Sequence, residues 1–416
     1  MLPHPTGGGT ELTMKLGVSL YPGLDNDKDK NIQLLKNAAA LGYQRVFTSL
    51  HIPECNAETL RSDAIYLFSL ADSLGLEVIA DVSPLAQKVL DIPELTPDSL
   101  KKFYISTVRF DYGTGAETIA AFSREMNVQL NASTARSVQL NVLLKANADF
   151  SRIDGQHNFY PRPHTGLSSE TIQRQNALLH RHDISAGVFV ASQTGKRGPL
   201  YAGLPSMESL RGTAPCDAAP ILTAIGCDSL IIGDSHPSFN ELQALADPET
   251  LAKADARYSR KALPPKKDWK PEEPLPLHIH VLSAAPFVKS LLSRSFTNRP
   301  DPAADVIRAN ESRDEMKHCD IHPERNENKL IIEMPKEYAA VFAGPQLLAN
   351  GKKSSLLPVG TVLLDNNDYG RYKGELQILT APQPFDPRSN VIAQVTKEDV
   401  PLLSLISAEI PFRFIM

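Results

Sequence analysis

Short apolar runs alternate with amphipathic stretches between Lys15 and Asp234. This alternation is typical of βα units, which build a parallel sheet. The apolar runs predict eight strands, at residues 16–21, 45–50, 77–82, 107–112, 128–132, 158–162, 185–190 and 229–233. Eight such units predict a (β/α)8 TIM barrel, an α/β fold that typically takes about 250 residues.

Several of the intervening stretches have helical periodicity. Residues 29–41 carry apolar side chains at helical spacing and are followed by Gly42, a residue type that commonly ends helices. Residues 58–74 are followed by Gly75 in the same way. A further helix is expected over 238–258.

The chain of 416 residues is too long for one ordinary core, and its composition changes along its length. We expect a frayed tail at 1–13, a barrel domain at 14–261, a stiff Pro-rich linker at 262–276 and a β-rich domain at 277–416. Strands of this second domain are predicted at 277–282, 329–334, 361–365, 375–379, 391–396 and 410–415, which favours a small barrel or sandwich.

Charge, the N-terminal sequence and cysteine content limit the classes of ligand and of cellular compartment that the chain fits. The formal net charge is -5 and there is no long basic run, which argues against nucleic-acid binding. Residues 1–13 lack a long apolar run, so we expect neither a signal peptide nor a membrane span. The four cysteines form no CxxC pair, and we expect reduced thiols in a reducing compartment.

Polar side chains follow almost every predicted strand, at the end where (β/α)8 barrels hold their sites. Side chains two residues apart in a strand share a face, so Arg109 and Asp111 are expected to point the same way. The same spacing predicts a shared face for Tyr160, Arg162 and His164, and a polar group at Asn131. The alternative for each is a helix cap or an ion pair, because Asp and Ser after a strand often cap the next helix.

Four acids at these strand ends are candidates for glycoside hydrolysis, which needs two carboxyl groups across the scissile bond: Glu54, Asp81, Asp111 and Asp234. Strands four and eight lie opposite in a ring of eight, so Asp111 and Asp234 are the expected pair. Asp81 could replace either. Contact with Arg109 would lower the pKa of Asp111, which suits a nucleophile or base.

A phosphate group needs cations and hydrogen-bond donors. The loop after strand seven, residues 193–201, contains Lys196 and Arg197 between glycines, and phosphate often binds here in barrels. Arg162 lies on the neighbouring unit and can hold phosphate in a bidentate way. A solvated loop is the alternative for Lys196 and Arg197. In the second domain, Arg371 lies in a segment that predicts a hairpin, or alternatively leans over the barrel mouth.

Eight motifs resemble the MupG-type 6-phospho-N-acetylmuramidases: LGVSLYPG, RVFTSLHIPE, IADVSP, VRFDYG, QLNAST, HNFYPRPHTGLS, KRGPLYAGLPSMESLR and IIGDS. The stretch YGRYKGELQI resembles the second domain of the same family. The resemblance implies a (β/α)8 barrel followed by a cyclophilin-like β domain. It implies cytoplasmic hydrolysis of N-acetylmuramic acid 6-phosphate–N-acetylglucosamine in cell-wall recycling, with no metal or organic cofactor.

Two positions depart from the family pattern. Gly23 and Ala202 stand where the family tends to have an acid. One alternative is therefore that the specificity is altered or the activity is lost, and that the chain is a non-catalytic phosphosugar-binding protein. A phosphosugar lyase or isomerase on the same barrel is the other alternative. The partner in each case is a small phosphorylated sugar, and the oligomeric state is left open, with a homodimer among the choices.

Overall fold

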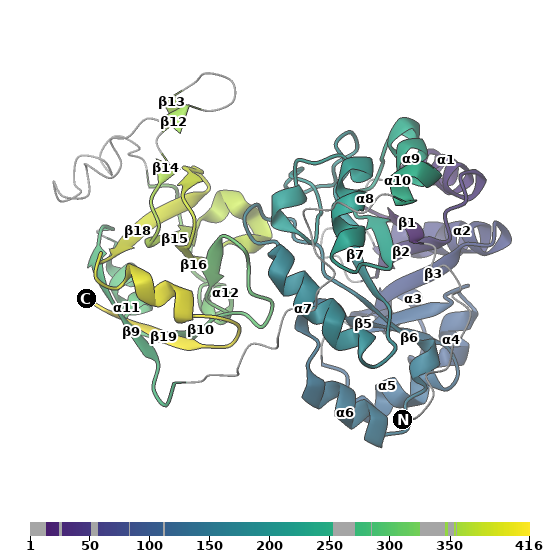
Figure 1. Ribbon diagram of the computed structural model, residues 1–416, viewed down its shortest axis with the longest axis horizontal. Coiled ribbons are helices and arrows are strands. Elements are labelled where there is room, and N and C mark those ends of the chain that lie inside the picture. The colour runs from purple at the N-terminus through teal and green to yellow at the C-terminus, as the bar shows by residue number, and fades with distance from the viewer. Residues whose placement is uncertain are drawn as a thin grey trace, which may run out of the picture. The chain divides into compact units, whose positions relative to one another are not determined.

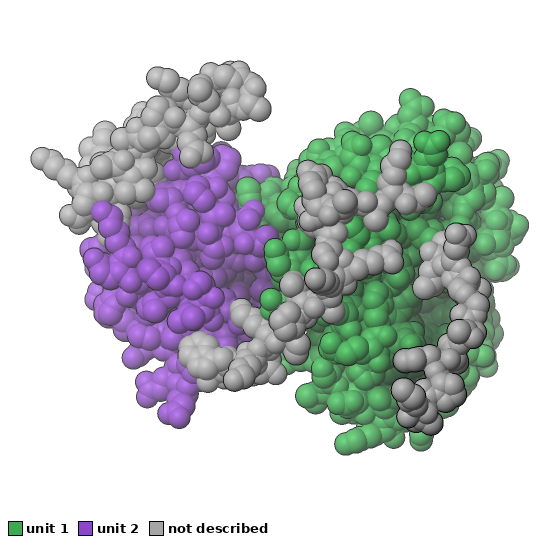
Figure 2. Space-filling view, viewed as in Figure 1, with its two compact units in different colours: residues 1–265 green, residues 266–416 purple. Residues whose placement is uncertain are grey.

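The computed structural model describes residues 14–24, 27–50, 57–82, 84–110, 113–252, 271–283, 285–324, 346–347, 353–354 and 356–416. The chain divides into two compact units, residues 1–265 and 266–416 (Figure 2). Each unit has its own hydrophobic core.

The first unit is a closed parallel barrel whose strands follow one another in chain order (Figure 1). The predicted TIM barrel is therefore confirmed. Its strands are β1 (Lys15–Leu20), β2 (Arg45–Ser49), β3 (Glu77–Val82), β4 (Thr107–Phe110), β5 (Asn127–Asn131), β6 (Ile153–Gln156), β7 (Ala186–Val190) and β8 (Ser229–Ile232).

Helices follow the strands and cover the outside of the barrel (Figure 1). Gly42 and Gly75 follow α1 and α2 with φ angles of 80° and 76°, which explains why glycine ends both helices. The helix predicted over 238–258 is wrong in one respect: Pro248 starts a new helix, so α9 and α10 are separate. The helices are α1 (Lys28–Ala40), α2 (Ala57–Ser73), α3 (Pro84–Leu90), α4 (Pro97–Lys101), α5 (Ala116–Ser123), α6 (Ser137–Lys145), α7 (Ser169–His180), α8 (Pro215–Ala224), α9 (Phe239–Ala246) and α10 (Pro248–Ala252).

The sixth strand lies elsewhere than the sequence predicts. The predicted strand at 158–162 is wrong, because β6 precedes it and residues 157–163 form a loop. Hydrophobicity does not reveal β6 because Asp154 and Gln156 face the lumen and only Ile153 offers an apolar side chain to the outer core. Gly155 has no room for one, since a Cβ there would lie 2.6 Å from Leu179.

The barrel lumen is layered. An ionic layer lies where the strands begin: Arg45 pairs with Glu77 at 2.8 Å and with Asp154 at 2.6 Å. Above it, a separate apolar cluster contains Tyr21, Phe47, Ile79, Phe189, Leu204 and Ile231. Polar residues at the carboxyl ends of the strands therefore lie above an apolar cluster.

The second unit is a mixed sheet of seven strands, curled into half a barrel, in the order β10-β19-β9-β18-β15-β16-β11. Its longer strands are β9 (Leu275–Val281), β15 (Thr361–Asp365), β16 (Leu376–Leu379), β18 (Ser389–Val395) and β19 (Pro411–Ile415), close to the predicted ranges. The shorter elements are β10 (Ser295–Thr297), β11 (Val306–Arg308), β12 (Gln346–Leu347), β13 (Lys353–Ser354), β14 (Leu356–Leu357), β17 (Gln383–Pro384), α11 (Pro286–Leu292) and α12 (Ser312–Glu315). The predicted strand at 329–334 lies outside the described residues.

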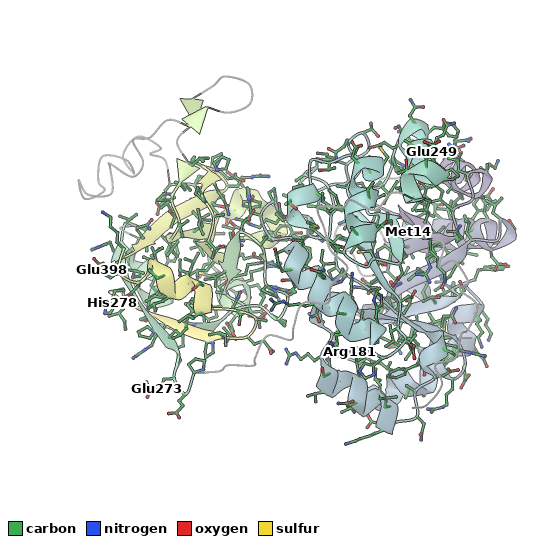
Figure 3. The ribbon with its side chains drawn as sticks, viewed as in Figure 1. Met14, Arg181, Glu249, Glu273, His278 and Glu398 are labelled. Carbon is green, nitrogen blue, oxygen red and sulfur yellow. The ribbon has the colours of Figure 1, made fainter. Side chains whose placement is uncertain are left out.

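The face of the barrel where the strands begin has a cavity of about 700 Å³. Met14 and Arg181, which Figure 3 labels, are among its lining residues. Residues at this face of a TIM barrel serve stability, so the candidate site is sought at the opposite end. In the part of the chain that the structure describes, no helix is both long and apolar enough to cross a bilayer.

Replacing Arg45 with alanine is expected to lower the free energy of unfolding by about 3–5 kcal/mol, because two largely buried carboxylates lose their cation. The control is Arg61→Ala, since Arg61 pairs with Asp91 and the two side chains are 46% and 71% exposed. That pair should contribute about 0–1 kcal/mol. Urea unfolding of both variants at pH 7 measures the difference, and equal small losses would show that the ionic layer does not stabilise the barrel.

Candidate active site

Strands β3 and β4 direct an acid and a cation into the mouth of the barrel. Ile79 belongs to the lumen cluster, so Asp81, two residues further along β3, faces the same way. Val108 and Phe110 belong to the outer core, so Arg109 between them faces the lumen. Asp81 and Arg109 are register partners in neighbouring strands, and both are buried.

Arg109 is the largest fully buried side chain of the described residues. Its guanidinium donates to the carbonyl oxygen of Gln156 at 2.9 Å, to that of Leu130 at 3.4 Å and to the side-chain oxygen of Asn158. These bonds tie the ends of β4, β5 and β6 together. Arg109 therefore contributes positive charge to the mouth and at the same time fixes Asn158.

A buried histidine behind β6 holds Asn158 from the other side. The Asn158 backbone N–H donates to Ser133 Oγ at 2.8 Å, and Ser133 Oγ lies 3.3 Å from His157 Nδ1. His157 Nε2 lies 3.0 Å from Asn176 Oδ1, whose amide nitrogen donates to the Ile225 carbonyl oxygen. A neutral imidazole fits, because Nε2 donates to Asn176 and Nδ1 accepts from Ser133. Burial, with help from the nearby Arg109 charge, lowers the pKa of His157 to about 4.

Arg197 lies over the aromatic floor. Its guanidinium carbon is 4.3 Å from the ring centre of Tyr21 and 5.3 Å from that of Phe159. The side chain is buried, and its Nε donates to the Gly198 carbonyl oxygen at 3.1 Å. Within the described residues, Nη1 is buried and has no hydrogen-bond partner. A buried guanidinium N–H without an acceptor is costly, and an anionic ligand would satisfy it.

Asp234, which follows β8, accepts three backbone N–H bonds from the loop after β7. Oδ1 accepts from Arg197 at 2.9 Å, and Oδ2 accepts from Ser192 at 2.9 Å and from Leu204 at 3.2 Å. Burial raises the pKa of Asp234 to about 6, against the effect of these bonds and of the Arg197 charge. Both oxygens are engaged by the loop, an arrangement that favours a role in shaping it over direct attack on a substrate.

The same loop is held at two further points. Glu241 on α9 accepts from the Gln193 N–H at 2.6 Å and from the Ser192 hydroxyl at 2.9 Å. Gly195 packs against the His236 carbonyl group so closely that a Cβ would lie 1.7 Å from its oxygen. Glycine is required there by this approach, which explains its place next to the two cations.

Arg162 and His164 lie in the loop that follows β6. Arg162 is buried, and its Nη1 donates to the Pro163 carbonyl oxygen at 3.0 Å. His164 has a φ of 69°, and its backbone N–H donates to Glu208 Oε1 at 2.8 Å. Tyr160 is buried with the outer core cluster, so its ring does not share the lumen with Asp81 or Arg109.

The remaining predicted residues are more scattered. Asn131 caps a short 3₁₀ helix by accepting from the Ser133 N–H at 3.0 Å, the alternative that the sequence left open. Lys196 is half-buried beside Arg197. Arg371 lies in the second unit, with its guanidinium 5.3 Å from the ring centre of Tyr372, so its role at the barrel stays a prediction. Glu54 and Asp111 lie outside the described residues.

Sequence reasoning missed several residues that build this region. Tyr21 and Phe159 read as ordinary apolar positions, although they form the surface under Arg197. Glu208 and Arg211 lie within the motif KRGPLYAGLPSMESLR, and their ion pair at 2.6 Å has the i,i+3 spacing of a helical turn. That spacing in the sequence could have predicted the ion pair. Over the described residues, no group of three His, Cys, Asp or Glu side chains could hold a metal ion.

Family profiles decide the identity of both units. Residues 16–247 match the N-terminal domain of 6-phospho-N-acetylmuramidase, and residues 343–415 match its C-terminal domain. The chain belongs to the 6-phospho-N-acetylmuramidase family. It is therefore a glycoside hydrolase of phosphorylated amino sugars, and the resemblance found in the sequence motifs is confirmed.

Two solved structures share the two-unit fold of this muramidase family member. An uncharacterized B. cereus protein has 24% identity and a TM-score of 0.50, and the match covers 97% of this chain and 100% of that one. A conserved protein of unknown function from Enterococcus faecalis has 27% identity and a TM-score of 0.51, with 97% and 96% covered. No curated protein shows significant similarity to the chain.

His157 gives the muramidase fold a defined response to acid. Its pKa is about 4 in the folded protein and about 6.5 in the unfolded chain, so between these values the unfolded chain binds more protons. Stability therefore falls as the pH drops through this window, by about 2 kcal/mol between pH 7.5 and 5. His157→Gln should lose about that much less on acidification. Urea unfolding at both pH values measures the loss of stability, with His182→Gln as the control. Equal losses in the unaltered protein and in both variants would contradict the role of His157.

Proposed function

We propose that this muramidase hydrolyses the bond between N-acetylmuramic acid 6-phosphate and N-acetylglucosamine, with Arg197 and Arg162 holding the phosphate. Family membership supports the reaction and the phosphorylated sugar. Because the formal net charge is -5, the surface as a whole does not attract an anion. Local cations have to do so, and we assign this role to Arg197 and Arg162, with Arg109 and Lys196 as further candidates.

The observation that carries this proposal is that Nη1 of Arg197 has no hydrogen-bond partner among the residues that the structure describes. The guanidinium is desolvated against Tyr21 and Phe159, so it has already lost the water that a surface arginine would keep. Its backbone N–H is held by Asp234 at 2.9 Å, which limits the motion of the residue. A desolvated and pre-positioned cation binds a phosphate oxygen with little further cost.

The two carboxyl groups that hydrolysis needs are proposed as follows. Asp81 supplies one, since it faces the mouth on the strand next to that of Arg109. The contacts of Asp234 support a positioning role, because the loop engages both of its oxygens. Asp111 and Glu54 stay the predicted candidates for the second carboxyl group.

We also propose a cytoplasmic role in the recycling of cell-wall sugars. A phosphorylated sugar is charged, and an apolar bilayer strongly disfavours the passage of a charged group. Its hydrolase therefore has to act on the side of the membrane where the sugar becomes phosphorylated.

Replacing Arg197 with methionine is expected to raise the KM for the phosphorylated disaccharide by about tenfold to a hundredfold, since a charge-assisted hydrogen bond is lost. Turnover of the unphosphorylated disaccharide should change little. Release of reducing sugar, followed by mass spectrometry, measures both. Arg124→Met, at an exposed arginine that ends α5, is the control. An unchanged preference for the phosphorylated substrate would remove Arg197 from the phosphate site.

Replacing Asp81 with asparagine is expected to lower kcat by about 10²–10⁴-fold and to leave the KM nearly unchanged, because the amide cannot transfer a proton or attack. Steady-state kinetics on the phosphorylated disaccharide measures this. Asp72→Asn, at an exposed acid on α2, should keep full activity. If Asp81→Asn retains its kcat, the carboxyl pair lies elsewhere.

A further inference from the structure

A buried ion pair joins the loop after β6 to the loop after β7. Glu208 Oε1 accepts from the His164 N–H at 2.8 Å and from Arg211 Nε at 2.7 Å. Oε2 accepts from the Gly166 N–H at 2.7 Å and from Arg211 Nη2 at 2.6 Å. Four donors therefore converge on one carboxylate, two from each side of the junction.

Arg211 completes the junction on the backbone of both loops. Its Nη1 donates to the Gly203 carbonyl oxygen at 2.9 Å, and its Nη2 donates to the Arg162 carbonyl oxygen at 3.2 Å. The side chains of Glu208 and Arg211 are only 7% and 13% exposed. The pair thus clamps the backbone of Arg162, whose side chain is the proposed phosphate ligand, against the loop that carries Arg197.

The turn that this pair holds is unfavourable by itself. His164 has a φ of 69°, in the left-handed region that non-glycine residues rarely adopt and that costs about 1 kcal/mol or more. Its N–H bond to Glu208 stabilises that conformation. Gly166 approaches Glu208 so closely that a Cβ would lie 2.7 Å from Oε2 and 2.9 Å from its backbone.

The electrostatics of the pair exclude a direct chemical role. The Arg211 guanidinium and the two backbone N–H groups lower the pKa of Glu208, in spite of its burial. An ionised carboxylate with both oxygens engaged by protein donors has no proton to give and no oxygen left for a substrate. Its contribution therefore has to act through the loops.

We propose that Glu208 and Arg211 are positioning residues that set Arg162 for the sugar phosphate, an inference that rests on the proposed function. The pair contacts the Arg162 backbone and not the reacting bond, so it governs recognition of the phosphate and not the chemical step. The preference for a phosphorylated substrate then depends on two residues that do not touch it.

The test compares Glu208→Gln and Arg211→Lys on the phosphorylated and unphosphorylated disaccharides. In Glu208→Gln, the amide N–H group would face the N–H donors that now bind the carboxylate. In Arg211→Lys, the ammonium group lacks the planar fork that reaches Glu208 and the two carbonyl oxygens. Each variant should raise the KM for the phosphorylated substrate by about tenfold or more, because displaced binding groups lose much of their effect. The kcat for both substrates and the KM for the unphosphorylated one should stay within about threefold.

Glu77→Gln is the matched control, because it also removes a carboxylate from a buried arginine pair but lies where the strands begin. It should leave both KM values unchanged. A KM for the phosphorylated substrate that stays the same, or that rises equally for both substrates, overturns the inference. If Glu208→Gln does not fold in thermal unfolding, Arg211→Lys, which keeps the charge, decides.

The proposed function fails separately, if the unaltered protein does not cleave the phosphorylated disaccharide. Calorimetric binding of N-acetylmuramic acid 6-phosphate then replaces the kinetic measurement. Weaker binding by Glu208→Gln and Arg211→Lys, but not by Glu77→Gln, supports the positioning role. Equal binding by all of the proteins overturns it.

Discussion

Carboxylates that accept backbone N–H bonds are the interaction on which the mouth of this barrel depends. The segment between β7 and α8 has little regular secondary structure, so its amide groups cannot be satisfied by a ladder or a helix. Asp234, which follows β8, and Glu241 on α9 accept several of them instead. Glu208, which lies in this segment, accepts the N–H groups of His164 and Gly166 from the loop after β6. These carboxylates join the segment to β8, to α9 and to the loop after β6, and Arg197 is fixed because its own N–H belongs to this network.

Much of the fold could be predicted from alternation alone, since a parallel strand covered by helices has to be apolar on its outer face. The failure at β6 shows the limit of that rule. Its lumen face is polar because Asp154 forms an ion pair with Arg45. Its outer face carries Gly155, because Leu179 leaves no room for a larger side chain there. Both facts depend on residues far away in the chain, and no local pattern carries them.

The site was predictable where strand alternation directs a side chain, and less so where a loop does. Arg109 lies between Val108 and Phe110 of the outer core, so alternation directs its side chain into the lumen. The face that it was predicted to share with Asp111 stays a prediction, because Asp111 lies outside the described residues. Tyr160 belongs to a loop, so the same rule does not apply to it, and its ring packs in the outer core. The contact of Arg197 with Tyr21 joins the ends of the first and seventh units, which only the closed ring brings together.

Arg197 Nη1, which lacks a hydrogen-bond partner in the described part of the chain, also has a consequence for the evolution of this enzyme. A buried N–H without an acceptor costs the free protein about 1–3 kcal/mol, a cost that a bound anion removes. An apolar side chain at this position would relieve the cost while it abolished the contact. Selection for heat resistance and selection for recognition of an anionic sugar therefore oppose each other at a single residue, and only the presence of the natural ligand in the cell reconciles them.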